Sequence, residues 1–153
     1  MGIIKSVDRL QPELARRTRI FLEYCREHAI DVCIIETLRR LEVQEAYYAQ
    51  GRKPLETVNE LRKKAGLWAI TESENSRTVT NTMKSRHMEG NAVDICPMKN
   101  GKPWWNAPDE VWEEIGILAE TFGLDWCAGG YGQTWGKGWD NPHFELMANF
   151  PGN

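Results

Sequence analysis

The sequence predicts an α+β fold: a single compact domain with a small, mainly antiparallel sheet and helices packed on one side of it. Two long segments, residues 12–28 and 109–122, repeat apolar side chains at helical spacing. Short segments with strand patterns lie between and after these helices, at residues 32–35, 92–96, 124–127 and 143–146. The chain of 153 residues is long enough to bury one core. We therefore expect one domain over residues 1–153.

The first helix has Pro12 in its first turn, where proline is tolerated, and ends near His28, where an imidazole suits the helix dipole. The apolar run Val32–Ile35 is rich in β-branched residues and indicates a buried strand. Arg39 and Arg40 follow the end of this strand. Two arginines there can bind a carboxylate ligand or pair with acids on the surface, and surface pairing is the commoner outcome.

Two further helices are expected over residues 42–50 and 55–65, because a glycine that suits a helix C-terminus follows each segment. The polar segment after them, up to Lys84, predicts a long loop. A loop of that length inside a compact domain is commonly functional, and this one leads directly into His87. We expect it to form a wall of a binding cleft.

The later strands alternate between two faces. Asp94 lies on one face of its strand, and a turn is expected to follow from Pro97 to Lys102. In the last strand, His143 and Glu145 share one face, while Leu146 is expected to be buried on the other.

The charge of the chain limits the classes of partner. The formal net charge is -3, without a strong basic excess or a long tail of one sign, so no nucleic acid partner is expected. The middle of the chain is nevertheless basic, with Arg52, Lys53, Arg62, Lys63, Lys64, Lys84 and Arg86. Such a group is most often solvated surface, and less often a side that faces an anionic polymer.

The cysteines and the hydropathy pattern indicate the cellular compartment in which the protein is expected. Cys25, Cys33, Cys96 and Cys127 have no paired spacing and lie in or beside apolar segments, which predicts reduced core residues. No apolar run approaches the ~20 residues that cross a bilayer, and no stretch of signal-peptide length begins the chain. We expect no transmembrane segment and a protein that is made in the cytoplasm and initially stays there.

Two of the three histidines lie near carboxylates: His87 precedes Asp94 by seven residues, and His143 follows Asp140 by three. Two imidazoles and one carboxylate can hold a catalytic zinc ion with an open fourth position, and a spare carboxylate can accept a proton. Glu145 either orients His143 or is a surface carboxylate. Spacing alone supports a metal site and structural histidines equally, because an isolated His/Asp spacing is a weak motif.

A resemblance to a known family favours the metal site. The pattern Ser-x-His-x-x-Gly-x-Ala-x-Asp, present from Ser85 to Asp94, and the segment Asp140-Asn141-Pro142-His143-Phe144-Glu145 resemble the zinc peptidases of the D-alanyl-D-alanine carboxypeptidase and dipeptidase family. The similarity is greatest to the phage branch, the L-alanyl-D-glutamate endolysins, because carboxypeptidase relatives usually have glutamate in place of Asp140. It covers about residues 32–146 and includes Glu36-Thr37-Leu38-Arg39-Arg40 with Gln44.

The chain departs from the family pattern in two places. Cys127-Ala128 stands where relatives commonly have glycines directly after a tryptophan. The segment of residues 53–78 is longer than the family minimum, and the resemblance does not explain its role.

The resemblance assigns roles to individual residues. The implied Zn²⁺ ligands are His87, Asp94 and His143. Asp140 is the implied general base. Arg39 is implied to bind substrate and stabilise developing negative charge, and Ser85 to lie at the substrate.

The implied function is a zinc-dependent peptidoglycan endopeptidase, an endolysin that cleaves the stem peptide of the bacterial cell wall between L-alanine and D-glutamate. The alternatives are a D-Ala-D-Ala carboxypeptidase or dipeptidase, and a non-catalytic zinc-binding module that recognises the cell wall. The expected partner is the stem peptide, and we expect a monomer without a separate cell-wall-binding domain. An endolysin made in the host cytoplasm would need a membrane-opening partner to reach the wall.

Overall fold

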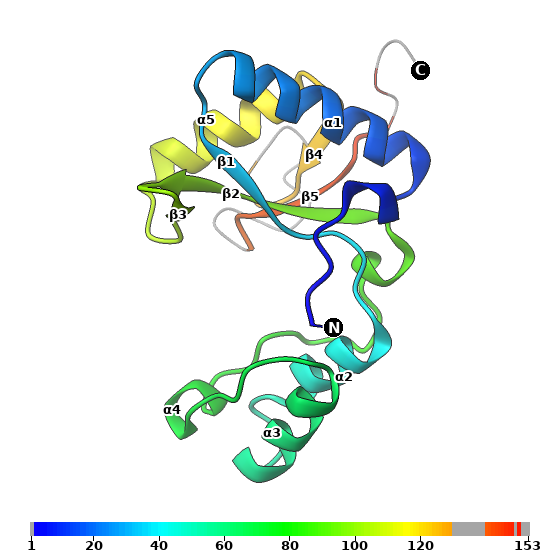
Figure 1. The fold of residues 1–153 in the computed structure, drawn as a ribbon, viewed down its shortest axis with the longest axis vertical. Coiled ribbons are helices and arrows are strands. Elements are labelled where there is room, and N and C mark those ends of the chain that lie inside the picture. Colours follow the sequence, from blue (N-terminus) through cyan, green and yellow to red (C-terminus); the bar gives the residue numbers. More distant parts are fainter. Residues whose placement is uncertain (1, 130–139, 149, 151–153) are drawn as a thin grey trace.

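The central sheet has the strand order β1 (Val32–Glu36), β2 (Ala92–Lys99), β5 (His143–Leu146) and β4 (Leu124–Trp126) (Figure 1). Neighbouring strands are antiparallel, and the short strand β3 (Lys102–Pro103) pairs with the end of β2. The computed structural model describes residues 2–129, 140–148 and 150. The predicted α+β class with an antiparallel sheet is confirmed.

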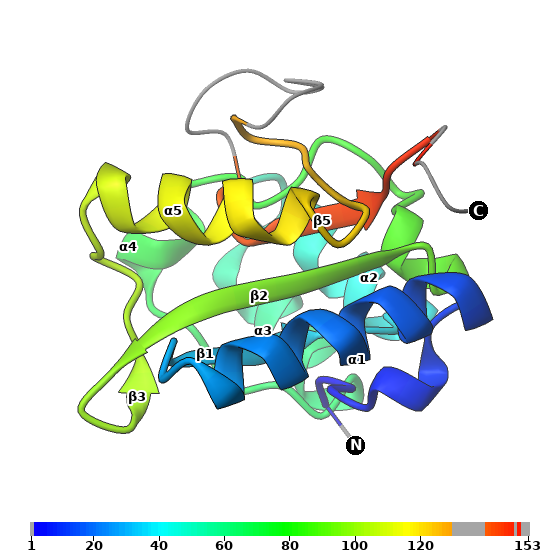
Figure 2. The same cartoon turned by 90° about the horizontal axis from the view of Figure 1, so that it is seen from above.

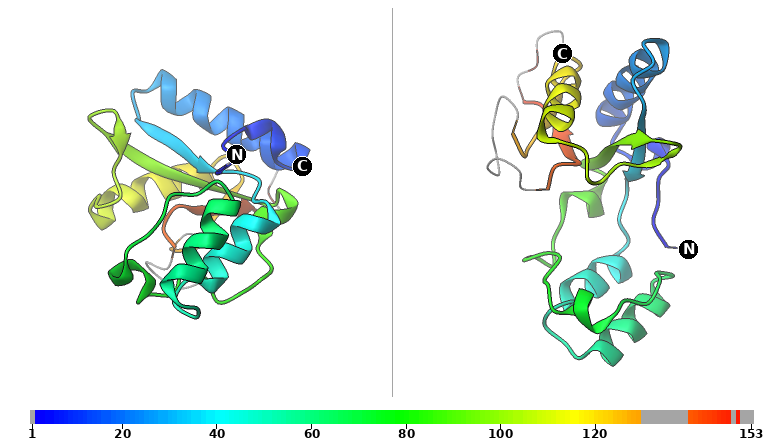
Figure 3. Two further views of the ribbon diagram at one scale, coloured as in Figure 1. Left: turned by 60° about the horizontal axis from the view of Figure 1, so that its bottom comes forward. Right: turned by 90° about the vertical axis from the view of Figure 1, so that its left-hand side faces the viewer.

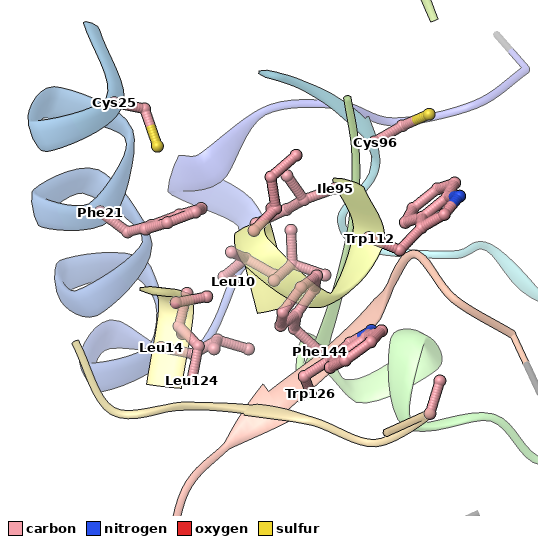
Figure 4. Close-up of a cluster of buried hydrophobic side chains, with 14 of the residues drawn as sticks. Leu10, Leu14, Phe21, Cys25, Ile95, Cys96, Trp112, Leu124, Trp126 and Phe144 are labelled. Carbon is pink, nitrogen blue, oxygen red and sulfur yellow. The ribbon is translucent and has the colours of Figure 1, made fainter. Parts of the chain in front are cut away.

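The two longest helices, α1 (Pro12–Glu27) and α5 (Asp109–Glu120), lie on the same face of the sheet (Figures 1 and 2). Their apolar faces meet the sheet in one core, where burial removes hydrocarbon surface from water. The residues of this core include Leu14, Phe21, Ile95, Trp112, Leu124 and Phe144 (Figure 4). Both helices were expected from periodicity, and both begin and end close to the expected residues.

A second layer of helices lies on the opposite side of the sheet, so the expected packing of helices on one side describes only α1 and α5 (Figures 1 and 3). It contains α2 (Leu41–Ala49), α3 (Leu55–Lys64) and the single-turn helix α4 (Glu72–Asn75). Gly51 and Gly66 follow α2 and α3 with φ angles of 82° and 78°, so the predicted glycine stops are confirmed. Within the expected loop, Thr71 forms a capping box with Glu74 and begins α4.

Two local expectations are wrong. The strand β2 continues to Lys99, so Pro97 lies in a strand and not in a turn. Proline is accepted there because the pairing of β2 with β5 ends at Asp94, and no ladder bond from residue 97 to β5 is lost. Leu146, expected to be buried, is the last residue of β5 and is 41% exposed.

All four cysteines are free, as expected; Cys25, Cys96 and Cys127 are buried, and Cys33 is partly buried. Burial raises the pKa of the Cys25 thiol to about 11, which keeps it protonated and unreactive near neutral pH. None of the helices in the described part of the chain has the length and apolar character needed to cross a membrane.

Candidate metal centre

The structure brings the three implied metal ligands together. Asp94 and His143 are paired across β2 and β5, and His87 lies on the one-turn helix η2 (Arg86–Glu89) just before β2. Asp94 Oδ1 lies 3.1 Å from His87 Nε2 and 3.5 Å from His143 Nδ1. The three donor atoms lie within 4.8 Å of one another, and all three residues are buried.

The distances between these donor atoms suit a small tetrahedral ion. Ligands bound to zinc at 2.0–2.1 Å in tetrahedral geometry lie roughly 3.3 Å apart. Both oxygen–nitrogen distances from Asp94 are close to this value. The donor set therefore fits a metal ion with three protein ligands and a fourth position for water or substrate.

The other nitrogen of each imidazole has its own partner. His87 Nδ1 lies 3.0 Å from the carbonyl oxygen of Thr37, and His143 Nε2 lies 2.8 Å from Glu145 Oε2. A carbonyl only accepts hydrogen bonds, so the Thr37 contact places the proton of a neutral His87 on Nδ1 and leaves Nε2 free for a metal. Carbonyl and carboxylate partners of this kind orient metal-binding histidines.

Neighbouring charges in this group shift the pKa values of Asp94 and His143. Burial alone would raise the pKa of Asp94, but the neighbouring His87 and His143 outweigh it and hold this pKa well below its usual range. Burial alone would lower the pKa of His143, yet hydrogen bonds to Asp94 and Glu145 raise it to about 9. Because histidine binds a metal ion in its neutral form, metal binding by His143 would release a proton.

A second group, Cys127, His143 and Glu145, also has donor atoms within 4.8 Å of one another. It shares His143, whose Nε2 already contacts Glu145. Burial and nearby carboxylates raise the pKa of the Cys127 thiol far above its usual range, and a thiol binds metal as the thiolate. The group of His87, Asp94 and His143 is therefore the better metal site.

The local sequence explains how η2 presents His87. The hydroxyl of Ser85 accepts a hydrogen bond from the backbone N–H of His87 at 3.2 Å and caps η2. Gly90 ends the turn with φ of 75°, and a Cβ atom there would lie 2.9 Å from the carbonyl oxygen of Arg9. Ser85 also lines the cleft, and its contact with substrate remains a prediction.

Asp140 lies beside this group, before β5. Its Oδ2 is 3.7 Å from His143 Nδ1, and its carbonyl oxygen accepts the backbone N–H of His143 at 3.0 Å. Its side chain is 43% exposed, so the carboxylate stands between the metal group and solvent. Partial desolvation and the like charge of Asp94 raise its pKa. Its φ of 54° is a strained conformation that aspartate tolerates better than most residues, and such strain is common at functional sites.

Arg39 is held in the same cleft by three side chains. Its Nε and Nη2 donate to Glu36 Oε1 at 3.1 and 2.6 Å, and its Nη1 donates to Gln44 Oε1 at 2.9 Å. The guanidinium also lies 4.9 Å from the centre of the Tyr47 ring. A guanidinium has five N–H groups, so these contacts leave two for a ligand. These contacts hold the Arg39 guanidinium in place, and its role in substrate binding stays a prediction.

The partners of Arg39 were not identified as functional from residue patterns. A usable signal was present, because Glu36 is a charged residue at the end of an otherwise apolar strand and lies three residues before Arg39. Glu36 is only 3% exposed, which requires a partner for its charge.

Replacing Glu36 by alanine should destabilise the protein by about 3–5 kcal/mol, because Arg39 would remain almost buried without its carboxylate. Glu36→Gln keeps an acceptor oxygen and should cost less. Urea unfolding measures both. The matched control is Glu23→Ala, which breaks an exposed Glu/Arg pair with the same spacing and should change the unfolding free energy by about 0.5 kcal/mol or less. Equal effects at Glu36 and Glu23 would contradict this prediction.

These residues line one cleft of about 890 Å³, to which α2 and α3 also contribute side chains. The metal group and Asp140 lie on the sheet side. Glu36, the last residue of β1, also lies on the sheet side, and the other walls include Arg39, Tyr47, Arg62, Val79 and Lys84. The expectation that the segment leading to His87 forms a wall of a cleft is confirmed by Thr80, Asn81 and Thr82, which also line it.

Fold and site together define an α+β domain with a buried His/Asp/His group that could hold a metal ion, beside a further carboxylate. The family model of the phage L-alanyl-D-glutamate peptidase matches residues 64–147, a range that contains the whole metal group and Asp140. The chain therefore belongs to the phage L-alanyl-D-glutamate peptidase family. The L-alanyl-D-glutamate peptidase of Escherichia phage T5 is 37% identical over 76 residues, covering 42% of this chain and 55% of that relative. The match thus spans about half the length of that relative.

Solved structures of peptidoglycan peptidases share the fold. The Serratia marcescens L-Ala D-Glu endopeptidase ChiX has a TM-score of 0.55 at 20% identity, over 92% of this chain and 83% of ChiX. The LD-carboxypeptidase LdcB has a TM-score of 0.58 at 15% identity, over 90% of this chain and 59% of LdcB. The D,D-pentapeptidase VanY, in complex with Zn(II), has a TM-score of 0.54 at 13% identity, over 90% of this chain and 72% of VanY. At these identities the likeness concerns the fold alone.

Proposed function

We propose that this protein is a zinc-dependent endopeptidase that hydrolyses the L-alanyl-D-glutamate bond of the peptidoglycan stem peptide and acts in bacterial lysis. The observation that carries the proposal is the group of His87, Asp94 and His143 at the floor of an open cleft, with Asp140 beside it. The family match over residues 64–147 supports the choice of bond. The zinc-bound VanY structure supports the choice of metal, because its fold is similar.

The residues of the cleft suit peptide hydrolysis. A bound zinc ion supplies Lewis-acid polarisation of a carbonyl and lowers the pKa of a water molecule. Asp140, next to the metal group and open to solvent, accepts the proton of the attacking water and returns it to the leaving amine. The two remaining N–H groups of Arg39 donate to a substrate carboxylate or to the oxyanion that forms at the scissile carbonyl.

A D-Ala-D-Ala carboxypeptidase or dipeptidase is the second candidate, because VanY and LdcB share the fold. Such an enzyme removes terminal residues, whereas an endopeptidase must accept chain on both sides of the scissile bond. A cleft open enough to leave Asp140 43% exposed is more suitable for the endopeptidase. The same intact Asp140 argues against a module that only binds the wall.

The deciding experiment is mass spectrometry of the fragments released from purified peptidoglycan. Zinc-loaded protein should release stem peptides that begin with D-glutamate, and protein treated with a chelator should release none. Restoring zinc to the chelated sample should restore release, which separates metal loss from unfolding. Release of D-alanine alone would favour the carboxypeptidase, and binding to the wall without any release would favour the recognition module.

A further inference from the structure

Some of the positively charged side chains that line the cleft form ion pairs with carboxylates, and others do not. Arg39 is paired with Glu36, and Arg86 lies 3.5 Å from Glu145. The carboxylates of Asp94 and Asp140 belong to the metal group or lie beside it. Among the residues that the structure describes, the other Arg and Lys side chains that line the cleft are Arg62 and Lys84.

Arg62 lies on α3, in the helical layer opposite the sheet, and its guanidinium is anchored at one end. Its Nε donates to the carbonyl oxygen of Trp68 at 2.5 Å. Within the described residues, Nη1 and Nη2 have no hydrogen-bond partner and no carboxylate within ion-pair distance. Glu74 is close enough for the charge of Arg62 to contribute to lowering its pKa, but Thr71 makes the main contacts with that carboxylate. The outer edge of Arg62 therefore remains available to a ligand.

Lys84 is on the segment that leads into η2. Its backbone N–H donates a hydrogen bond to the hydroxyl oxygen of Thr82, and its carbonyl oxygen accepts one from the Thr82 hydroxyl, both at 2.9 Å. These contacts fix the backbone, while the exposed ammonium has no ion pair with any residue that the structure describes. Arg62 and Lys84 thus line one cleft from separate segments, and neither forms an ion pair with a carboxylate in the described part of the chain.

The proposed substrate has carboxylates on one side of the scissile bond. On the L-alanine side, the stem peptide is joined to the sugar by a neutral amide. On the other side, D-glutamate is linked onward through its γ-carboxyl group, which leaves the α-carboxylate free, and the peptide ends in another carboxylate. Two cations without a paired carboxylate suit the D-glutamate side of the scissile bond. Binding of its carboxylates there would fix the orientation of the peptide in the cleft.

We propose that Arg62 and Lys84 form an anion subsite that binds the carboxylates on the D-glutamate side of the stem peptide. The inference rests on the proposed function and gives a role to the segment of residues 53–78, which contributes Arg62. The two residues determine specificity: they distinguish stem peptides with free carboxylates from stem peptides whose carboxylates are amidated.

The test compares two synthetic peptides, N-acetyl-L-Ala-γ-D-Glu-L-Lys-D-Ala with free carboxylates and the same peptide with both carboxylates as carboxamides. Arg62→Ala and Lys84→Ala should each lower kcat/KM for the free-carboxylate peptide about fivefold, mainly through KM, as expected for partly solvated charge pairs. Neither variant should change kcat/KM for the diamide. The matched control is Lys63→Ala, on the same helix and exposed but not lining the cleft, which should behave as wild type on both peptides.

Equal losses on both peptides, or a loss of the same size in Lys63→Ala, would overturn the subsite. A separate binding measurement keeps it distinct from the proposed function. Calorimetry with zinc-loaded Asp140→Asn protein should show tighter binding of the free-carboxylate peptide, and Arg62→Ala in that background should reduce this preference about fivefold. If wild type cleaves neither peptide, the proposed function fails, and this binding preference still decides the subsite.

Discussion

Replacing His87 by alanine is expected to remove metal binding and hydrolysis together. The imidazole supplies one of three donor atoms, and its Nε2 is held towards Asp94 by the contact of Nδ1 with Thr37. Loss of an outer partner of a metal ligand already costs about 10–100-fold in affinity, so loss of the ligand itself should cost more than about 100-fold. Metal content after dialysis, measured by mass spectrometry, and release of stem peptide should fall in parallel.

The third histidine of the chain provides a matched control. His28 is exposed at the end of α1, where its ring stacks on Tyr24 and contacts the carbonyl oxygen of the same residue. His28→Ala should keep full metal content and activity. Because His87 is buried, His87→Gln, which retains a polar side chain of similar length, shows whether any loss comes from misfolding; circular dichroism checks both variants. Full metal content in a folded His87 variant would contradict the proposed ligand set.

Much of the fold could be predicted because its signals are local. The helical repeat of α1 and α5 and the glycines after α2 and α3 depend on neighbouring residues, and each gave nearly correct boundaries. The strand β2 was predicted too short because a proline normally ends a strand, and only the position of β5 shows that no ladder bond is lost at Pro97.

The site was predictable to the extent that its residues stand in short motifs. His87 and Asp94 lie seven residues apart, but the pairing of Asp94 with His143 joins segments 49 residues apart. This contact could be expected only from a family resemblance. The contacts of Arg39 with Gln44 and Tyr47 depend on how α2 packs after β1. The position of Arg62 in the cleft wall depends on the packing of α3 against α2, which residue patterns in a polar segment do not encode.

The second large effect is expected at Asp140, where asparagine should reduce hydrolysis by about 10²–10⁴-fold, the usual contribution of a general base, while the metal content stays unchanged. Hydrolysis should fall without loss of metal because Asp140 is not one of the three buried donor residues. Its Oδ2 lies 3.7 Å from His143 Nδ1, and its side chain is 43% exposed. Asparagine is the suitable replacement because it accepts the φ of 54° as readily as aspartate does, whereas alanine would add backbone strain. Hydrolysis rates on a stem peptide and metal content per chain are the measurements.

Asp31→Asn is the control for this change, because Asp31 is exposed next to the start of β1, outside the lining of the cleft. Its backbone carbonyl accepts a hydrogen bond from the N–H of Met98, which this substitution keeps. It should match wild type in both measurements. Undiminished hydrolysis by Asp140→Asn would mean that another group takes the proton of the attacking water. Loss of metal from Asp140→Asn would instead make Asp140 a ligand, and a three-donor site with a separate base would no longer describe this cleft. Activity lost with metal retained is the one combination that assigns proton transfer to Asp140 and metal binding to the three buried residues.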